Sequence, residues 1–505
     1  MSFTTDTGNL FQSDAQHQKA AVRAARAEAL ESVGNPIKLS TKPLRVVIRQ
    51  PQTKGKRAEP EGWVAESGFV VRRVGLDSGK TKQLYKGHCG PVTSLDFYRP
   101  TTGTQLTRDL LISGSWDKTF RVWDIQTKTH LSTTIAHNDF VKALVVIPSL
   151  KVLVTGSSDK DLRVWDLAPL ESWDFASLAS PPSGTSTPAE DNSEPTPPPQ
   201  LRAGAAPPAA VSHRPLPCLL ALKAHTRPIE QLAYYDLLES SDDDDEQPRK
   251  KTGRTALLSA DSMGALKIWE LWREESGAIK GELRCQTRPH ELAIYDMVVG
   301  EEGELWTASA DHSVLLSSLS LSTPSTPPTP LLRLPHPSQV RSLLPLAAAL
   351  PALSAPYLLT ASSDELLRIF SLASSACDPD PAREQRREWR GIGLAEGSVP
   401  DGCVREVEGH THEIVQLRAY VSEATGTTED GADEGGGKKR EAWILSASLD
   451  GTLRRWKWPE MLLEERERLV LVPVVEQGEG EEKKKESLLT EEEERELEEL
   501  MADDE

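Results

Sequence analysis

The chain has 505 residues, enough for two or three ordinary domains or for one large repeat fold. Its 77 acidic and 58 basic residues give a net charge of −19, which argues against duplex nucleic acid as a general partner. The five cysteines form no CxxC pair, and no apolar run approaches the roughly 20 residues that span a bilayer. We therefore expect a soluble protein of the cytoplasm or nucleus, with free thiols.

The first element along the chain is a short helix. Ser13 and Gln16 match a capping box before an alanine-rich run over 15–33, and Gly34 with Pro36 supplies a stop signal. Residues 1–42 are interpreted as a helical and otherwise flexible tail. We expect the helix to be solvated, with docking on the fold or on a partner as the alternative.

Four short alternating segments come next, and we interpret them as strands. They cover residues 44–49, 63–66, 69–74 and 82–85.

A phrase then recurs six times: small residues, an aspartate in most copies, and an alternating run that in most copies ends in an aromatic residue. Its clearest copies run from Ser113 to Asp124 and from Thr155 to Asp166, and related copies cover 259–269, 307–317, 360–370 and 446–456. A histidine near a turn precedes each copy; these are His88, His137, His225, His290, His336 and His410.

At these residues the sequence resembles the WD-repeat family, whose signature is a Gly-His turn followed by a closing Trp-Asp. The resemblance implies an all-β, seven-bladed propeller over 43–475, with 44–86 as a degenerate first blade. Ring closure needs a last outer strand. Residues 469–475 fit best, and an N-terminal strand is the alternative.

The resemblance also implies a hydrogen-bonded tetrad in each complete blade, which pairs buried polar groups that would otherwise be costly. Three sets match: His88, Ser113, Asp117, Trp123; His137, Thr155, Asp159, Trp165; and His410, Ser446, Asp450, Trp456. Three blades depart from this pattern, with Met263 at the Asp position and with Ser317 and Phe370 at the Trp position.

In this scheme the long Pro-, Ser-, Gly- and acid-rich insertions all project from one face, the bottom. They lie near 167–214, 236–253, 320–330, 373–400 and 422–439, and we expect them to be disordered. They hold possible phosphorylation sites at Ser240, Ser241, Thr187 and Thr323.

The compact opposite face, the top, is the predicted partner-binding surface. The candidate contacts are Trp116, Lys118, Phe140, Arg227, His312, Ser363, Glu413 and Leu449. Trp116 is the preferred anchor because exposed aromatic residues dominate interface hot spots. Packing of Trp116 against the neighbouring blade is the alternative.

The last segment, 476–505, is acidic and has helical spacing, with Leu497, Leu500 and Met501 on one face. We expect it to serve solubility, and recognition of a basic partner surface is the alternative.

Catalytic motifs are weak throughout. The tetrad hydroxyls are expected to be tied to an indole, and the glycines of 391–397 lack the Lys-Ser/Thr ending of a phosphate loop. We therefore expect no enzyme, no cofactor and no metal site.

The predicted function is a scaffold that binds other proteins or peptides, as part of a multiprotein complex, without direct contact with nucleic acid or membrane. The alternative is a substrate-recognition subunit of a ubiquitin ligase. Gln126 and Ala168 stand where some such receptors have Arg after Trp-Asp-x.

Overall fold

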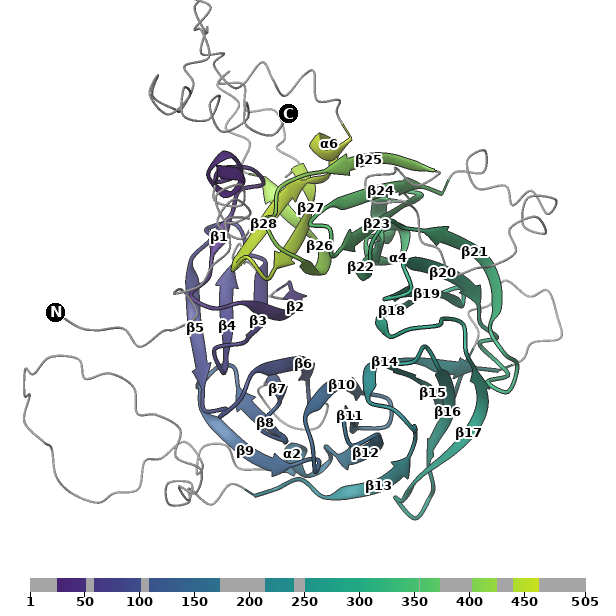
Figure 1. The fold of residues 1–505 in the computed structure, drawn as a ribbon. Helices are drawn as coiled ribbons and strands as arrows, with labels where there is room; N and C mark the ends of the chain where they lie inside the picture. Colours follow the sequence, from purple (N-terminus) through teal and green to yellow (C-terminus); the bar gives the residue numbers. More distant parts are fainter. Residues whose placement is uncertain are drawn as a thin grey trace, which may run out of the picture. The chain divides into compact units, whose positions relative to one another are not determined.

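The computed structural model describes residues 25–50, 59–100, 109–172, 214–239, 250–353, 355–372, 402–424 and 439–462. Its strands form seven four-stranded antiparallel sheets, which Figure 1 shows arranged like blades around a common axis. This is the predicted seven-bladed propeller. The described strands belong to one compact unit that ends at Met461.

The first three blades follow chain order. Blade 1 is β2 (Pro43–Arg49), β3 (Glu61–Glu66), β4 (Val70–Gly75) and β5 (Thr81–Lys86). Blade 2 is β6 (Val92–Tyr98), β7 (Leu110–Ser115), β8 (Thr119–Asp124) and β9 (His130–Ile135). Blade 3 is β10 (Val141–Ile147), β11 (Val152–Ser157), β12 (Asp161–Asp166) and β13 (Cys218–Lys223), with α2 (Pro169–Ser172) after β12.

The remaining blades repeat this order. Blade 4 is β14 (Ile229–Leu238), β15 (Lys251–Asp261), β16 (Leu266–Arg273) and β17 (Ile279–Thr287). Blade 5 is β18 (Ile294–Val299), β19 (Glu304–Ser309), β20 (Ser313–Ser318) and β21 (Thr329–Pro335). Blade 6 is β22 (Val340–Pro345), β23 (Tyr357–Ser362), β24 (Leu367–Ser371) and β25 (Cys403–Val407), with α4 (Leu346–Ala349) and the 3-10 turn η2 (Pro351–Leu353) after β22. Blade 7 is β26 (Ile414–Ala424), β27 (Lys439–Ser448), β28 (Thr452–Lys457) and β1 (Ile37–Lys38), followed by α6 (Trp458–Met461).

The first strand of each blade lies nearest the axis, as Figure 1 shows for β2, β6, β10, β14, β18, β22 and β26. Each of these strands contacts the inner strands of both neighbouring blades, including β2 with β26. The ring is therefore closed, and no inner strand is left as a free edge.

An N-terminal strand completes blade 7. Ile37 pairs with Leu453 and Lys38 with Thr452, so β1 occupies the outer position beside β28. The preference for 469–475 as this strand is corrected by this pairing, because the outer place in the sheet is already filled; 469–475 lies outside the described residues. The fold accordingly begins before residue 43.

The residues before β1 are held on blades 6 and 7. Residues 25–29 are helical, and Arg26 forms ion pairs with Glu365 at 2.8 Å and with Glu408 at 3.6 Å. The Arg455 amide donates to the Gly34 carbonyl at 2.7 Å, where Gly34 takes a left-handed φ of +68°. Arg26 and Gly34 thus attach this segment to the fold, which favours the docking alternative, although four of the five helical residues 25–29 are exposed.

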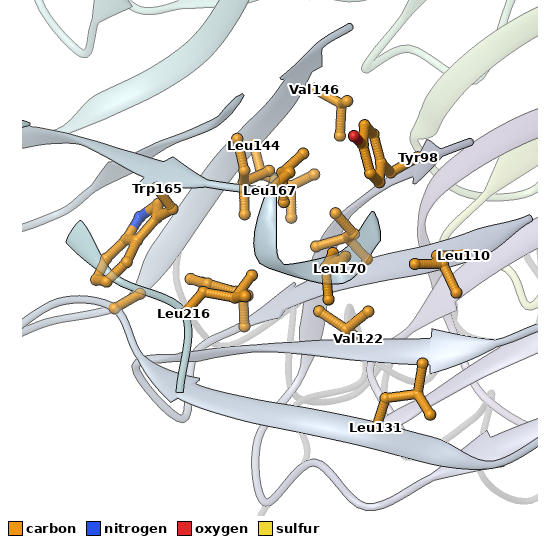
Figure 2. Packing of buried hydrophobic residues seen from close by; sticks show 14 of the residues in the cluster. Tyr98, Leu110, Val122, Leu131, Leu144, Val146, Trp165, Leu167, Leu170 and Leu216 are labelled. Carbon is orange, nitrogen blue, oxygen red and sulfur yellow. The ribbon is translucent and has the colours of Figure 1, made fainter. Parts of the chain in front are cut away.

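The core lies between neighbouring blades. Successive side chains of a strand point to opposite faces of the sheet, and both faces of a blade pack against neighbouring blades. Every residue of β7 and of β11 is therefore buried. Figure 2 shows the cluster between blades 2 and 3, where Trp165 and Tyr98 lie on opposite sides and Leu170 of α2 lies between them. Each such interface ties a blade to the next.

The long insertions join the first strand to the second, or the third to the fourth, as predicted. Apart from 320–330, their central parts lie outside the described residues, as do Ser240, Ser241, Thr187, residues 391–397 and the tail 476–505. Strands reach further into 236–253 and 422–439 than we expected.

The insertion at 320–330 is ordered, which corrects the expectation of disorder. The Leu238 amide donates to the Leu321 carbonyl at 3.0 Å, and the Tyr235 hydroxyl donates to the Ser320 carbonyl at 3.3 Å. Thr323, a possible phosphorylation site, shares a hydrogen bond of 2.6 Å with the Ser320 hydroxyl. A short, proline-stiffened segment with apolar Leu321 can pack where a longer polar insertion cannot.

Four cysteines fall within the described residues and are free thiols: Cys89, Cys218, Cys285 and Cys403. Over the same part of the chain, no helix has the length and apolar character needed to cross a bilayer.

Candidate partner-binding face

The turns of each blade divide between two ends of the ring. The turns from second to third strand, and those from one blade to the next, share the end that we call the top face. The first group covers 67–69, 116–118, 158–160, 262–265, 310–312, 363–366 and 449–451; the second covers 39–42, 87–91, 136–140, 224–228, 288–293, 336–339 and 408–413.

Hydrogen-bonded tetrads fix these turns. In blade 2, His88 Nε2 lies 2.9 Å from Ser113 Oγ and His88 Nδ1 lies 2.7 Å from Asp117 Oδ2, while the Trp123 indole donates to Ser113 Oγ at 2.9 Å. The equivalent bonds form in blade 3 and in blade 7. Those sets are His137, Thr155, Asp159, Trp165 and His410, Ser446, Asp450, Trp456.

Blade 4 has a complete tetrad that the sequence pattern did not reveal. Met263 occupies the expected Asp position, but Asp261, two residues earlier, places Oδ2 3.2 Å from His225 Nδ1. Ser259 Oγ completes the set, 2.8 Å from His225 Nε2 and 3.0 Å from the Trp269 indole nitrogen. Asp261 also accepts hydrogen bonds from the Met263 and Ala265 amides.

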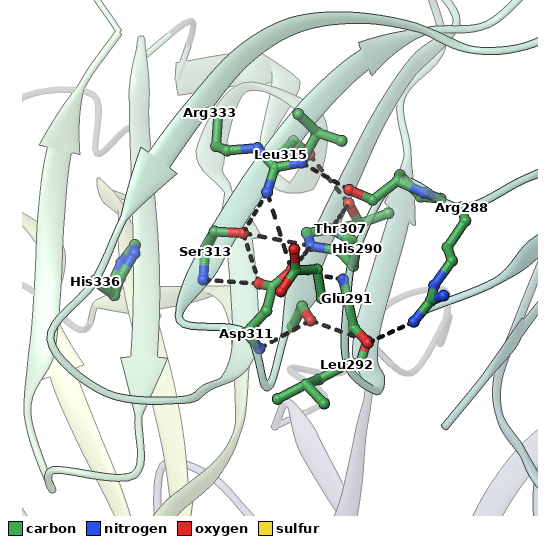
Figure 3. A network of polar contacts seen from close by, with 12 residues as sticks. Arg288, His290, Glu291, Leu292, Thr307, Asp311, Ser313, Leu315, Arg333 and His336 are labelled. Carbon is green, nitrogen blue, oxygen red and sulfur yellow. Dashed lines mark hydrogen bonds and ion pairs between the residues drawn. The ribbon is translucent and has the colours of Figure 1, made fainter. Parts of the chain in front are cut away.

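Blade 5 keeps three members of the set. His290 bonds Thr307 and Asp311, each at 2.8 Å, and Ser317 stands in the Trp position. Figure 3 shows Arg333 filling the space beside this network, where its guanidinium donates to Ser313 Oγ and to the Pro289 carbonyl. These contacts differ from those of a tetrad indole, which in the complete blades donates to the second-strand hydroxyl that Thr307 provides here.

In blade 6 the histidine loses its aspartate. His336 bonds Thr360 at 3.0 Å, turns Nδ1 toward the Leu334 carbonyl and packs against Phe370. The turn aspartate, Asp364, pairs instead with Arg368 at 2.7 Å. Arg368 is 2 % exposed and is also held by Glu406 and Ser362.

Burial and pairing together set the charge of these groups. Burial lowers the pKa of His88 and of His410, and it lowers the pKa of His336 to about 4. Burial alone would raise the pKa of Asp159, Asp311 and Asp450, but the hydrogen bond and charge interaction with the neighbouring histidine, together with hydrogen bonds from the turn, outweigh it and hold these pKa values at about 2. The turns are therefore fixed by carboxylates that stay ionised at neutral pH.

The preferred anchor residue is exposed, but it is not alone. Trp116 stacks on Phe140 with ring centroids 5.1 Å apart and an interplanar angle of 20°. Trp116 is 41 % exposed and Phe140 is 39 % exposed, although one comes from blade 2 and the other precedes blade 3. The contact with the neighbouring blade and the solvent-facing surface coexist, so the two interpretations of Trp116 are compatible.

Three other candidates gather around one arginine. Arg341 pairs with Glu413 at 2.9 Å and donates to Ser363 Oγ at 3.3 Å, and the Leu449 amide bonds the Glu413 carbonyl. This cluster lies over blades 6 and 7, away from the aromatic pair.

The remaining candidates are also turn residues: Lys118 shares the turn of Trp116, Arg227 lies in the turn before blade 4, and His312 lies in a turn of blade 5. Lys118 and His312 have left-handed φ angles of 70° and 63°, and their carbonyls bond the next inter-blade turn. Arg227 is exposed beside blade 4.

Several exposed top-face residues were missed by the sequence reasoning. Lys160 follows Asp159 in the same way that Lys118 follows Asp117, and this repeat position could have identified it. Arg288 and Leu292 line an open depression of about 670 Å³ between blades 4 and 5. Met263, 38 % exposed, lies beside it, because Arg288 Nε donates to the Met263 carbonyl at 3.0 Å.

Hydrogen bonds within the tetrads already occupy the hydroxyl groups beneath this face. The tetrad hydroxyls are buried and already bonded to both a histidine and an indole in four blades. Within the described ranges, no group of three His, Cys, Asp or Glu side chains could hold a metal ion.

Comparisons with known proteins agree with this architecture. The WD40 family model (WD domain, G-beta repeat) matches residues 79–124 and 128–166. An uncharacterised WD repeat-containing protein of Schizosaccharomyces pombe is 32% identical over 114 residues, covering 23% of this chain and 30% of that protein.

Two further relatives carry the name periodic tryptophan protein 2 homolog. The one from Neurospora crassa is 33% identical over 94 residues, covering 18% of this chain and 10% of the relative. The one from Schizosaccharomyces pombe is 35% identical over 75 residues, covering 14% and 8%. The matched segments thus span less than a third of each relative.

Proposed function

This chain is a seven-bladed WD-repeat β-propeller, and we propose that it serves as an interaction scaffold whose top face binds partner proteins or peptides. Propellers of this family are typical protein-interaction scaffolds. The finer assignment, to this face and to particular residues, rests on the geometry of the turns.

The observation that carries the proposal is the exposed Trp116–Phe140 stack. Large apolar side chains at a protein surface cost solvation free energy, and tryptophan is enriched in interface hot spots. The tetrads on either side, His88 with Asp117 and His137 with Asp159, hold the two turns rigid. Little conformational entropy would be lost when a partner binds there.

The partners that we expect are other proteins, with the propeller as one member of a multiprotein complex. The ubiquitin-ligase alternative gains nothing from the relatives, whose printed names mention WD repeats and periodic tryptophans alone. We therefore propose the scaffold function without that specialisation.

The test is affinity purification from the native cell with quantitative mass spectrometry, comparing the wild type with Trp116→Ala plus Phe140→Ala. The matched control is Leu283→Ala plus Leu331→Ala, because these leucines are 41 % and 55 % exposed on the outer strands β17 and β21. Specific partners should be lost from the first variant and kept by the second. Retention of all partners by the first variant would overturn the assignment to the top face.

A further inference from the structure

One arc of the top face is continuous across blades 2 to 4. Backbone hydrogen bonds join its turns in series: Ala136 to the Lys118 carbonyl, Ser158 to the Phe140 carbonyl, and His225 to the Lys160 carbonyl. The series continues from Ser262 to the Pro228 carbonyl, and then from Arg288 Nε to the Met263 carbonyl. We call Trp116, Lys118, Phe140, Lys160, Arg227 and Arg288 the basic arc.

The arc is unusual in charge for this chain. Lys118, Lys160, Arg227 and Arg288 are all exposed, and among the described residues none of the four forms an ion pair. Besides the tetrad residues Asp117 and Asp159, two acids stand in the same turns, the half-buried Asp139 and the exposed Glu291. The exposed side chains of the arc thus carry more positive than negative charge in a protein whose net charge is −19.

The tetrad carboxylates below the arc stay ionised, but among the described residues they form no ion pair with these four cations. Asp117 and Asp159 accept hydrogen bonds from histidines and from turn amides instead. The third strands of blades 3 and 4 also place a cation near the same turns. Arg163 donates to the Ala136 carbonyl and Lys267 to the Ala224 carbonyl, each at 2.8 Å.

In the opposite sector of the top face, two acidic side chains are already paired with a cation of this chain. Glu365 and Glu408, in the turns of blades 6 and 7, pair with Arg26 from the N-terminal segment. The chain therefore covers an acidic part of its own top face with a basic side chain. The basic arc, in contrast, holds exposed cations around an exposed aromatic stack.

We infer that the basic arc binds an acidic peptide segment of a partner protein, with a large apolar side chain of that segment seated on the Trp116–Phe140 stack. This inference rests on the proposed scaffold function and specifies its partner. Electrostatic complementarity would give selectivity and fast association, and the aromatic pair would provide the desolvated contact. Single-stranded RNA also favours cations and aromatics. The exposed apolar side chain of Met263 nearby offers a further contact to an apolar residue of a peptide and favours a peptide over RNA.

The experiment is a selection of a phage-displayed library of random short peptides on the purified full chain. It is repeated on two variants of equal charge change. The arc variant is Lys118→Glu with Lys160→Glu and Arg227→Glu. The control variant is Lys80→Glu with Lys128→Glu and Lys280→Glu, three exposed residues away from the top face, of which Lys128 shares the left-handed φ of Lys118. Circular dichroism verifies that both variants are folded.

On the wild type and on the control variant, we expect enrichment of peptides that combine Asp or Glu with Leu, Phe or Trp. Synthetic copies of these peptides should bind the arc variant at least about ten-fold more weakly, and their binding should weaken as salt rises. Selection of peptides without acidic bias, equal loss in both variants, no selection at all, or tighter binding of oligouridine than of any selected peptide would overturn the inference. The proposed function fails separately, if native partners survive Trp116→Ala plus Phe140→Ala.

Discussion

Asp261 Oδ2 lies 3.2 Å from His225 Nδ1, so blade 4 has a working turn aspartate two residues before the position where the repeat places it. The side chain reaches from the end of β15 and accepts the amides of Met263 and Ala265 with its other oxygen. The blade thereby regains the carboxylate–histidine pair and frees position 263 for an exposed apolar residue. A tetrad requires that the aspartate carboxylate lie within hydrogen-bonding distance of the histidine. More than one sequence spacing between the aspartate and the rest of the set meets this requirement.

Asp261→Ala is expected to lower the free energy of unfolding by about 1–3 kcal/mol, because His225 and two turn amides lose a buried, ionised acceptor. Met263→Ala is expected to change it by less than about 0.5 kcal/mol, since Met263 lies at the surface. Urea unfolding followed by tryptophan fluorescence measures both. A loss of equal size in the two variants would show that Asp261 does not support the turn.

Acid should destabilise the protein through its buried histidines before its carboxylates titrate. Burial holds the pKa of His336 at about 4 in the folded state, below the value of about 6.5 expected in the unfolded chain. The unfolded state then binds more protons, so the stability from this group is complete above about pH 6.5 and is lost as pH falls toward 4. His88 and His410, whose pKa values are also lowered, act in the same direction.

His336→Gln, which keeps a hydrogen-bonding side chain near Thr360, should therefore flatten this pH dependence. The wild-type stability should fall between about pH 7 and pH 4.5 by up to about 3 kcal/mol more than that of the variant. Urea midpoints at a series of pH values measure the difference. Parallel curves would mean that His336 is not neutral in the folded state.

Ring closure should depend on Ile37. This residue is 6 % exposed and packs in a cluster with Leu453, whereas its neighbour Lys38 is exposed. Ile37→Asp would bury a charge in the last blade, and we expect a loss of about 3 kcal/mol or more. Lys38→Asp should cost less than about 1 kcal/mol, because its ion pair with Glu31 is exposed.

Urea unfolding compares these two variants, and size-exclusion chromatography reports association through an opened sheet edge. If Ile37→Asp proved as stable as Lys38→Asp, β1 would contribute little to closure of the ring.

The sequence predicted most of the fold because alternation and the recurring Gly-His and Trp-Asp positions are local signals. It failed where contacts are made at long range. The two-residue β1 is too short for periodicity to reveal, and its partner Leu453 lies at the other end of the chain. Asp261 was missed because its side chain reaches His225 from a position two residues before the one that the repeat pattern specifies.

The candidate site was predictable to a similar degree. The turn positions follow from the repeat, so Trp116 and Phe140 could be placed on one face from their spacing. Their stacking could not be predicted from the sequence, because it depends on the angle between blades 2 and 3. The pairing of Arg26 with Glu365 joins residues more than 300 positions apart and has no local signature.

The Trp116–Phe140 stack should couple the two residues energetically in the free protein. A double-mutant cycle with Trp116→Ala and Phe140→Ala is expected to give a coupling of about 0.5–1.5 kcal/mol, the range for aromatic pairs. Each single substitution should be mild, because both rings are partly solvent-exposed. The control cycle pairs Trp116→Ala with Leu283→Ala on the outer strand of blade 4, and it should be additive within about 0.5 kcal/mol. A stack that couples in the free protein is a preformed platform, ready for a partner side chain. Additivity of Trp116 and Phe140 would mean that the two rings move independently and that the anchor surface forms only on binding.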